Sequence, residues 1–349
     1  MSLDIENSGG GGGAGIPKGT GATGGHPQDP GGARETRGLR TSPSPGPLVP
    51  GFELGQTFAM EGREVTASEI SRFQRKGFVR VAGILGLAEV DRFGAAVDQG
   101  VLDRTQHDTR SLAEKSHYEQ SFQQCINLWE DRPAVRPLSF HPIVARAAAA
   151  LLGVEAIRIW HDQALYKESK GRETDPHQDL PYWPIAEPQA LTAWIPFQPV
   201  RRKNGAVGFL AGSHRVGLRR FANIFTGKGL DLDAMPETRD QEFEYVDADP
   251  GDVVFHHGLT VHRAHPNASE APRRVHTVIY FADGCTRTEF GHPSVDRPGV
   301  PVGSRIESDL TPIAWPRPEG DLPPAPPAPE PAIAGWPGWR GRRGGPTQP

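Results

Sequence analysis

The sequence predicts a mainly β protein with some α-helix: a double-stranded β-helix, or jelly-roll barrel, with an N-terminal helical layer and disordered tails. Three observations lead to this prediction. Helical periodicity is concentrated before Gly153, short β-rich runs separated by turn signals follow it, and Gly and Pro gather at both ends of the chain.

The two ends differ in composition from the middle of the chain. Of the 349 residues, 42 are Gly and 35 are Pro, and many of them lie in residues 1–55 and 316–349. These ends hold too few apolar side chains to offset the entropy lost on ordering, so we expect both to be disordered tails. The remaining residues, 56–315, are enough for one large domain, with the helical layer in 56–153 and the barrel in 154–290.

Charge and cysteine content exclude several classes of protein. The formal net charge is −4 at pH 7, which gives no general attraction to nucleic acid. Two cysteines, Cys125 and Cys285, do not make a disulfide framework. The most apolar stretch, residues 147–152, is too short to span a membrane. We therefore expect a cytoplasmic protein that binds neither nucleic acid nor membrane, and the oligomeric state stays open.

Helix signals dominate the first part of the domain. Thr66 and Glu69 form a capping-box pattern that predicts a helix ending at Gly77, and a strand is expected at 78–81. Apolar residues at helical spacing predict two further helices, at 87–101 and 142–152.

Strand signals dominate the second part of the domain. The expected strands are 156–160, 164–167, 191–197, 206–210, 252–257 and 275–281. Asn204 and Gly205 form a two-residue hairpin signal between two of these strands. Residues 215–248 are polar and irregular, and we expect a long insertion there, of the kind that often acts as a lid.

A possible metal site is suggested by His177 and Asp179. In an extended chain, two residues at this spacing point to the same side. A second histidine would complete a 2-His-1-carboxylate facial triad, which leaves open positions on iron(II). Alone, the pair is a weak signal, because a loop histidine hydrogen-bonded to a nearby carboxylate gives the same pattern.

The motifs that follow this pair resemble the phytanoyl-CoA dioxygenase family. In chain order they are His177, Gln178, Asp179 and Leu180; the aromatic pair Tyr182 and Trp183; Trp194 in a β-rich run; Asn204 and Gly205; Gly212, Ser213 and His214; Pro250, Gly251 and Asp252; and then His262 and Arg273. Their order and spacing extend over about 100 residues, which is more specific than any single motif.

The resemblance implies a set of cofactors and roles. His177, Asp179 and His262 would hold iron(II), and Arg273 would pair with the distal carboxylate of 2-oxoglutarate, with Trp194 nearby. With O2 as the oxidant, the implied reaction hydroxylates an unactivated C–H bond of a small organic molecule and releases succinate and CO2.

Other histidines compete for the position of the distal ligand. The spacing from Asp252 and to Arg273 favours His262. The alternatives are His256, His257, His265 and His276.

Strand parity supports a buried position for Arg273. Alternate residues of a strand point to the same face, so Arg273 shares a largely apolar face with Val275 and Thr277. Arg274 points to the opposite face and is expected to be solvated. A buried arginine needs an anion, and the co-substrate implied by the resemblance would supply one.

Substrate contacts are harder to predict. Tyr182 and Trp183 are candidates for the wall of the substrate pocket, with ordinary packing as the alternative. Gln124 and Lys167 are candidates for contacts with substrate or co-substrate, with a solvated position as the alternative. One departure from the family is Ala264, because the family often has a serine two residues after the distal histidine.

Two other classes of function remain open. One is a catalytically silent jelly-roll binding or scaffold protein, which would have no need of a full triad together with Arg273. The other is an oxygenase that acts on protein or nucleic acid, and the acidic balance argues weakly against nucleic acid.

Overall fold

The computed structural model describes residues 63–219, 221–236, 240–317 and 321–327. The predicted N-terminal tail, residues 1–55, lies outside the described residues, as do residues 328–349 of the predicted C-terminal tail.

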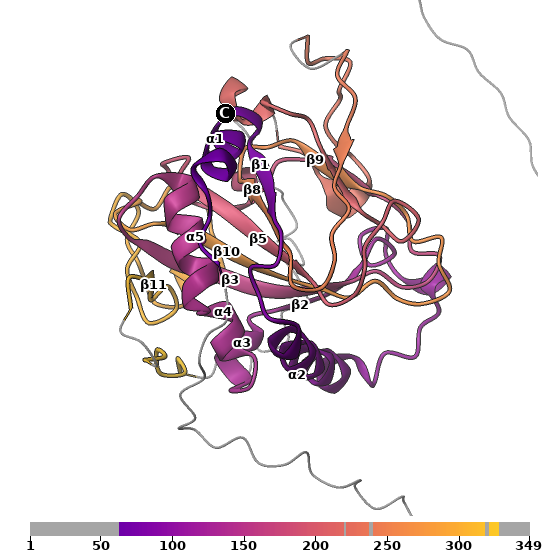
Figure 1. Cartoon of the computed structure of the whole chain (residues 1–349), viewed down its shortest axis with the longest axis horizontal. Helices are drawn as coiled ribbons and strands as arrows, with labels where there is room; N and C mark the ends of the chain where they lie inside the picture. Colours follow the sequence, from indigo (N-terminus) through magenta and orange to yellow (C-terminus); the bar gives the residue numbers. More distant parts are fainter. Residues whose placement is uncertain (1–62, 220, 237–239, 318–320, 328–349) are drawn as a thin grey trace, which may run out of the picture. The chain divides into compact units, whose positions relative to one another are not determined.

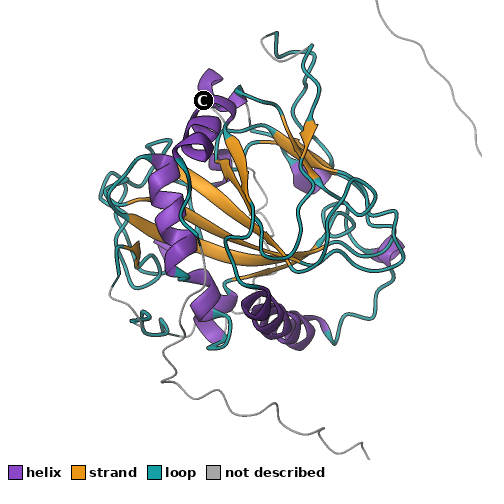
Figure 2. Ribbon diagram, viewed as in Figure 1, coloured by secondary structure: helices purple, strands orange, loops and turns teal. Residues whose placement is uncertain are grey.

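Most helices of the described chain gather on one face of a large sheet (Figures 1 and 2). These are α1 (Ala67–Lys76), α2 (Leu87–Thr105), α3 (Leu128–Asp131), α4 (Arg136–Ser139) and α5 (Pro142–Leu152). The short helix α6 (Pro293–Asp296) is on the cavity side, where Val295 belongs to a buried cluster with Trp160 and Trp183. Short 3-10 helices are η1 (Leu112–Glu114), η2 (Leu180–Tyr182), η3 (Ser213–Val216) and η4 (Ile224–Thr226). The capping box predicted for α1 is confirmed: Thr66 Oγ1 accepts from the Glu69 amide, and the Glu69 carboxylate accepts from the Thr66 amide.

Two antiparallel sheets form the β portion. The strands are β1 (Phe78–Val81), β2 (Gln123–Ile126), β3 (Ile157–Tyr166), β4 (Thr174–His177), β5 (Ala190–Pro196), β6 (Val207–Phe209), β7 (Glu244–Tyr245), β8 (Val253–His257), β9 (His262–Ala264), β10 (Val275–Ala282) and β11 (Ile313–Trp315). The seven-stranded sheet has the order β1-β8-β5-β10-β3-β11, with β2 also paired to β3. The four-stranded sheet has the order β4-β9-β6-β7. This arrangement, with helices on the outside of the large sheet, confirms the predicted jelly-roll class.

Apolar side chains are buried in two main layers. The largest cluster lies between the helices and the large sheet and includes Val97 of α2, Val144 of α5 and Val278 of β10. Another cluster joins the two sheets, where Phe78 of the large sheet stacks on Phe209 of the small one with ring centres 4.5 Å apart. The large sheet is therefore buried on both faces, and the space between the sheets holds both packing residues and the site described below.

Several predicted elements are confirmed with adjusted bounds. Two predicted strands are in fact a single strand, and the predicted hairpin is wrong. Residues 156–160 and 164–167 belong to one continuous strand, β3. The turn at Asn204 and Gly205 exists, with Gly205 at φ 96°, but it does not connect paired strands. β5 pairs with β8 and β10, whereas β6 pairs with β7 and β9 in the other sheet. The local turn chemistry was read correctly, but the chain crosses between sheets there.

Part of the predicted insertion and part of the predicted C-terminal tail join the domain. β7, inside residues 215–248, adds a strand to the small sheet. Past residue 316, Leu322 packs against the main core cluster, and Arg317 donates to the Ile313 carbonyl at 2.7 Å. The boundary predicted at residue 316 therefore falls too early, because an apolar side chain within the Pro-rich segment finds a place on the core.

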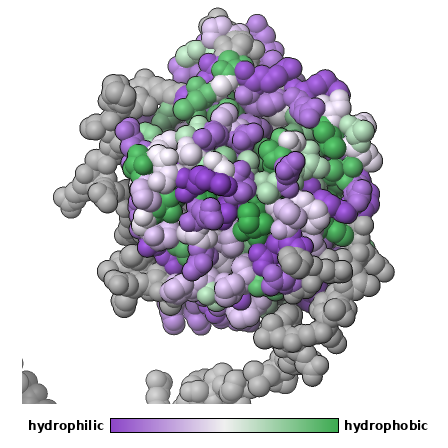
Figure 3. Space-filling model, turned by 90° about the vertical axis from the view of Figure 1, so that its left-hand side faces the viewer, coloured by the Kyte–Doolittle hydropathy of each residue, from purple (hydrophilic) through white to green (hydrophobic). Residues whose placement is uncertain are grey.

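No helix within the described ranges has both the length and the apolar character needed to cross a membrane. On the face drawn in Figure 3, apolar residues occur in small groups between polar ones.

Candidate metal centre and its cavity

The small sheet brings the three predicted metal ligands together. His177 ends β4 and His262 begins β9, and the two residues are partners in the antiparallel pairing of these strands. Asp179 lies two residues beyond His177 and directly before η2. The chain turns there, so that the Asp179 side chain faces the strand ends. The register of two short strands therefore positions residues that are 85 positions apart in sequence (262 − 177).

The geometry of these residues suits one metal ion. Asp179 Oδ1 lies 3.5 Å from His177 Nε2 and 3.6 Å from His262 Nε2. One ligand atom from each of the three residues lies within 4.8 Å of the others, and both histidines are buried. His177 Nδ1 is 2.8 Å from the Asp175 carbonyl and His262 Nδ1 is 3.0 Å from the Thr260 carbonyl. A neutral imidazole that donates from Nδ1 leaves its Nε2 lone pair for a metal.

The second oxygen of Asp179 is held by two further side chains. Thr192 Oγ1 donates to Oδ2 at 2.9 Å, and His256 Nε2 lies 3.0 Å from the same atom. Burial opposes ionisation of Asp179, but His262, His177 and His256 hold the pKa of this carboxyl well below its usual range. For His262, burial and the neighbouring His177 lower the pKa to about 3. Asp179 is therefore a carboxylate and His262 a neutral imidazole, which are the protonation states that bind a divalent metal.

The remaining histidines that competed for the distal position lie elsewhere. His257 packs near Phe73 and His214 on the helical side, and His265 stacks on Tyr245. His276 is buried beside Asp162, with its Nε2 3.3 Å from Oδ2. Of the residues considered, His256 alone approaches the site, and it does so as a partner of Asp179.

Arg273 lies in the same cavity as the triad, as its strand parity predicted. It is 2% exposed and donates to the carbonyls of Gly205 at 3.0 Å and Leu165 at 3.2 Å. Its guanidinium carbon is 5.5 Å from the ring centre of Trp194, which also lines the cavity. Within the described ranges no carboxylate pairs with Arg273, and its Nε has no hydrogen-bond partner. Burial lowers its pKa to about 10, so it stays charged at neutral pH.

Lys167 does not line the cavity. Its backbone pairs with that of Arg273, and its side chain is 0% exposed. Its Nζ donates to the Arg172 carbonyl and lies 3.5 Å from Thr174 Oγ1. Burial and the neighbouring Arg273 lower its pKa to about 6. The side chain therefore lies neither on the cavity wall, where it could contact substrate or co-substrate, nor in solvent, which was the alternative.

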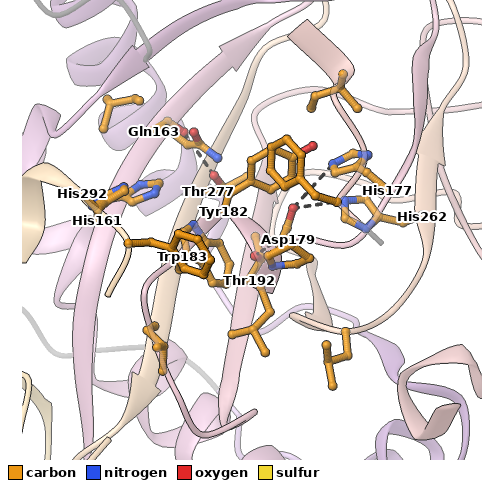
Figure 4. Close-up of a pocket in the computed structure, with 18 of the residues that line it drawn as sticks. His161, Gln163, His177, Asp179, Tyr182, Trp183, Thr192, His262, Thr277 and His292 are labelled. Carbon is orange, nitrogen blue, oxygen red and sulfur yellow. Dashed lines mark hydrogen bonds and ion pairs between the residues drawn. The ribbon is translucent and has the colours of Figure 1, made fainter. Parts of the chain in front are cut away.

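The triad and Arg273 share one cavity of about 1470 Å³. Tyr182 and Trp183 line it, as the sequence suggested, and so does Gln124, whose amide bonds to Gln163 and whose carbonyl accepts from Tyr118. Figure 4 shows Tyr182 and Trp183 between the triad on one side and His161 with His292 on the other.

The predicted insertion supplies part of the cavity wall. Leu218, Phe221 and Phe225 line the cavity. The Gln178 side chain, between two ligands, donates to the Gly217 carbonyl at 3.0 Å and accepts from the Arg219 amide at 2.8 Å. The start of the insertion is therefore tied directly to the metal-ligand segment.

Several residues of the site were not predicted. Thr192 and His256 face each other on β5 and β8, so both reach Asp179, but only the register of the sheet reveals this. His161, Gln163 and His292 line the far part of the cavity. No local motif marks them, because each is a single polar residue in an otherwise ordinary segment.

Comparison with known proteins agrees with this geometry. Residues 73–275, more than half of the chain, match the family described as Phytanoyl-CoA dioxygenase (PhyH). The chain is 30% identical over 132 residues to a probable alpha-ketoglutarate-dependent hypophosphite dioxygenase of Stutzerimonas stutzeri, covering 37% of this chain and 46% of the relative. It is 25% identical over 245 residues to methylphosphonate hydroxylase of Gimesia maris, covering 65% and 85%.

A solved structure is also similar. The non-heme alpha ketoglutarate dependent carbocyclase SnoK from nogalamycin biosynthesis has a TM-score of 0.62 and 26% identity, covering 71% of this chain and 96% of SnoK. In the first three curated relatives the match spans about half of the relative, from 46% to 52%. The match over residues 73–275 nevertheless contains the whole triad and Arg273. The chain therefore belongs to the phytanoyl-CoA dioxygenase family, a family of iron- and 2-oxoglutarate-dependent oxygenases.

Proposed function

We propose that this protein hydroxylates, or otherwise oxidises, an unactivated C–H bond of a small organic molecule, with 2-oxoglutarate and O2 consumed and succinate and CO2 released. The observation that carries the proposal is a buried His-Asp-His triad in one cavity with a buried arginine that has no carboxylate partner among the described residues. A cytoplasmic location and a substrate that is neither protein nor nucleic acid belong to the same proposal.

The residues present fit iron(II). Two imidazoles and one carboxylate converge from one side, the donor set of a facial triad, and leave the cavity side for the co-substrate and oxygen. When bound, iron supplies the redox chemistry that activates O2 and breaks the C–H bond. The protein's own part is to hold the ligands, to position two substrates and to exclude water.

Each part of the site has a role in this proposal. Thr192 and His256 fix Oδ2 of Asp179, so that Oδ1 is aimed at the metal position. Arg273 binds the distal carboxylate of 2-oxoglutarate, and its two backbone acceptors keep the guanidinium plane in place. Trp194 packs beside Arg273 and restricts water at that end.

The silent-scaffold alternative predicts neither the ligand geometry nor the unpaired arginine. An uncompensated buried charge is costly, and a protein without an anionic ligand would gain stability by replacing it. The names of the relatives do not determine the substrate, because hypophosphite dioxygenase, methylphosphonate hydroxylase and a carbocyclase act on different molecules.

The test is anaerobic spectroscopy followed by turnover. The protein is purified under nitrogen, loaded with iron(II) and titrated with 2-oxoglutarate to millimolar concentration. We expect the metal-to-ligand charge-transfer absorption of chelated 2-oxoglutarate, and succinate formation stimulated by a fraction of a metabolite extract after oxygen is admitted. Absence of the absorption band would refute the oxygenase proposal in favour of a scaffold.

A further inference from the structure

The wall of the cavity beyond the triad is largely aromatic. Its aromatic side chains include Tyr118, Phe122, Tyr182, Trp183, Phe221 and Phe225. Several of them contact each other: Tyr182 packs edge-on against Phe221, with ring centres 4.9 Å apart, and Tyr118 packs on Phe225 at 4.5 Å. Such rings give extended, flat apolar surfaces, which suit a ligand with ring systems of its own.

The cavity has room for a substrate much larger than a small oxyanion. Its volume is about 1470 Å³. Pockets for drug-sized ligands are typically about 300–1,000 Å³. Subtracting a five-carbon co-substrate leaves room for a molecule of several fused or linked rings, whereas a small oxyanion would leave most of this apolar wall facing water.

The arginines on the wall have interactions within the chain, and two of them, Arg287 and Arg297, pair with carboxylates. Arg287 bonds to Asp296 and to the Val300 carbonyl, and Arg297 pairs with Glu130 at 2.9 Å. Arg263 donates to the Tyr245 hydroxyl at 2.7 Å, and Arg219 also has interactions within the chain. Arg273 is the buried cation left for an anion, and the proposed function assigns it to 2-oxoglutarate. An anionic substrate that used Arg287 or Arg297 would have to break an ion pair.

One polar group at the far side of the cavity is suited to a neutral hydroxyl. His161 is buried, lies edge-on to Trp183 and stacks on His292 (Figure 4). Its Nδ1 lies 3.4 Å from the Asp162 carbonyl, and no described residue forms a hydrogen bond with Nε2. Burial lowers its pKa to about 4, so the ring is neutral at pH 7. With the proton on Nδ1, Nε2 accepts a hydrogen bond.

We propose, on the basis of the proposed function, that the substrate is a large, uncharged, polycyclic molecule carrying a hydroxyl that donates to His161 Nε2. The aromatic wall supplies most of the binding free energy, through burial of the ring system. His161 orients the molecule, because one hydrogen bond at a fixed distance from the triad selects which carbon faces the metal position.

The experiment uses four probes on the full chain loaded with iron(II) and 2-oxoglutarate without oxygen. The probes are a phenanthrol, its methyl ether, its phosphate monoester and methylphosphonate, and the readouts are quenching of tryptophan fluorescence and perturbation of the charge-transfer band. We expect the phenanthrol to bind at least about tenfold more tightly than either anion. It should bind about fivefold more tightly than its ether, because only the phenol donates a hydrogen bond.

Variants identify the group that recognises the hydroxyl. His161→Leu should remove the difference between phenanthrol and ether, and His161→Gln should retain part of it, because an amide oxygen still accepts. His265→Leu is the matched control, since His265 lies on Tyr245 and does not line the cavity. Tighter binding of either anion than of the phenanthrol overturns the proposed substrate class. A phenol–ether difference that persists in His161→Leu overturns the role of His161.

The two proposals can fail separately. If 2-oxoglutarate gives the charge-transfer band but none of the ring compounds binds, the substrate class is wrong and the oxygenase function stands. If no band forms, the oxygenase function fails, and fluorescence quenching still shows whether the cavity binds a neutral ring system.

A different observation concerns the Arg273 end of the cavity. Thr174 lies directly opposite Ala264 in the pairing of β4 with β9, and both residues line the cavity. Ala264 is the position at which the family often carries a serine. The Thr174 hydroxyl is buried and lies 3.5 Å from Lys167 Nζ, from which it accepts, and no described residue accepts from it. Its O–H is therefore available to a group in the cavity.

We infer that Thr174 donates to the distal carboxylate of 2-oxoglutarate and replaces, from the neighbouring strand, the hydroxyl that Ala264 lacks. Partners in an antiparallel pair lie about 4.5–5.5 Å apart at Cβ, so a hydroxyl on either strand can reach a ligand held between them.

The test exchanges the hydroxyl between the two strands. Thr174→Val should weaken 2-oxoglutarate binding about fivefold to tenfold in the charge-transfer titration, with iron(II) affinity unchanged. Thr174→Ser should bind like the parent, and Thr174→Val with Ala264→Ser should regain most of the loss. A parent-like titration of Thr174→Val, or no recovery in the double variant, overturns the inference.

Discussion

Arg273→Gln should separate co-substrate binding from metal binding. The guanidinium is 2% exposed, and its two bonds to carbonyls fix its plane while Nε has no partner. A carboxylate that reached it would be desolvated and would depend on it for charge compensation. Removing one partner of a buried pair costs about 3–5 kcal/mol. Glutamine can still donate one hydrogen bond, so we expect a loss of about 3 kcal/mol, which is at least a hundredfold in the dissociation constant.

Arg274→Gln is the matched control on the adjacent residue. The sequence suggested that Arg274 is solvated, but its guanidinium pairs with Asp98 of α2 at 2.6 Å and bonds to Gln198. Both partners of this ion pair are about one third exposed, so its loss should cost at most about 1 kcal/mol of stability. Because Arg274 does not line the cavity, 2-oxoglutarate binding should not change.

The assay is the charge-transfer absorption of the iron(II) protein, titrated with 2-oxoglutarate without oxygen. Iron content and thermal unfolding are measured on the same samples, so that a metal or folding defect is distinguished from a weak co-substrate. A titration curve of Arg273→Gln that overlays the parent curve would show that the distal carboxylate is bound elsewhere. A parallel loss in Arg274→Gln would show that the effect is transmitted through the fold.

Three further predictions concern the ligands, the product and the C-terminal segment. His262→Ala should abolish iron(II) binding, whereas His256→Ala should weaken it by about 10–100-fold, as for other residues that orient a ligand. Metal analysis measures both effects, and the reverse order would mean that the distal ligand is misassigned. With Asp179 as the third ligand, turnover in chloride buffer should give a hydroxylated product, and a mainly chlorinated product by mass spectrometry would contradict this. Deleting residues 328–349 should leave the melting temperature unchanged. Deleting residues 318–349 also removes Leu322 from the core and should lower the melting temperature by about 2–4 °C. Equal melting temperatures of the two deletion variants would argue against this packing.

The metal centre could be predicted because the spacing of its residues in the sequence indicates a metal site. His177 and Asp179 are two residues apart at one strand end, and His262 begins the strand that pairs with it. Few residue types bind iron, so substitutions at these positions are restricted and a motif persists. The failed hairpin at Asn204 and Gly205 shows the opposite case, because a turn motif specifies local backbone geometry and leaves the choice of pairing partner to the whole sheet.

Apart from Tyr182 and Trp183, the cavity wall could not be predicted, for a related physical reason. Its aromatic side chains come from segments as distant as Tyr118, Trp183 and Phe221, and any large apolar residue can serve in such a wall. Composition therefore carries no positional signal, and only tertiary packing shows that these rings meet. The hydroxyl of Thr174, opposite Ala264, could not be predicted either. In the sequence Ala264 reads as the loss of a binding residue, and only the pairing of β4 with β9 shows that a hydroxyl is still available at that end of the cavity.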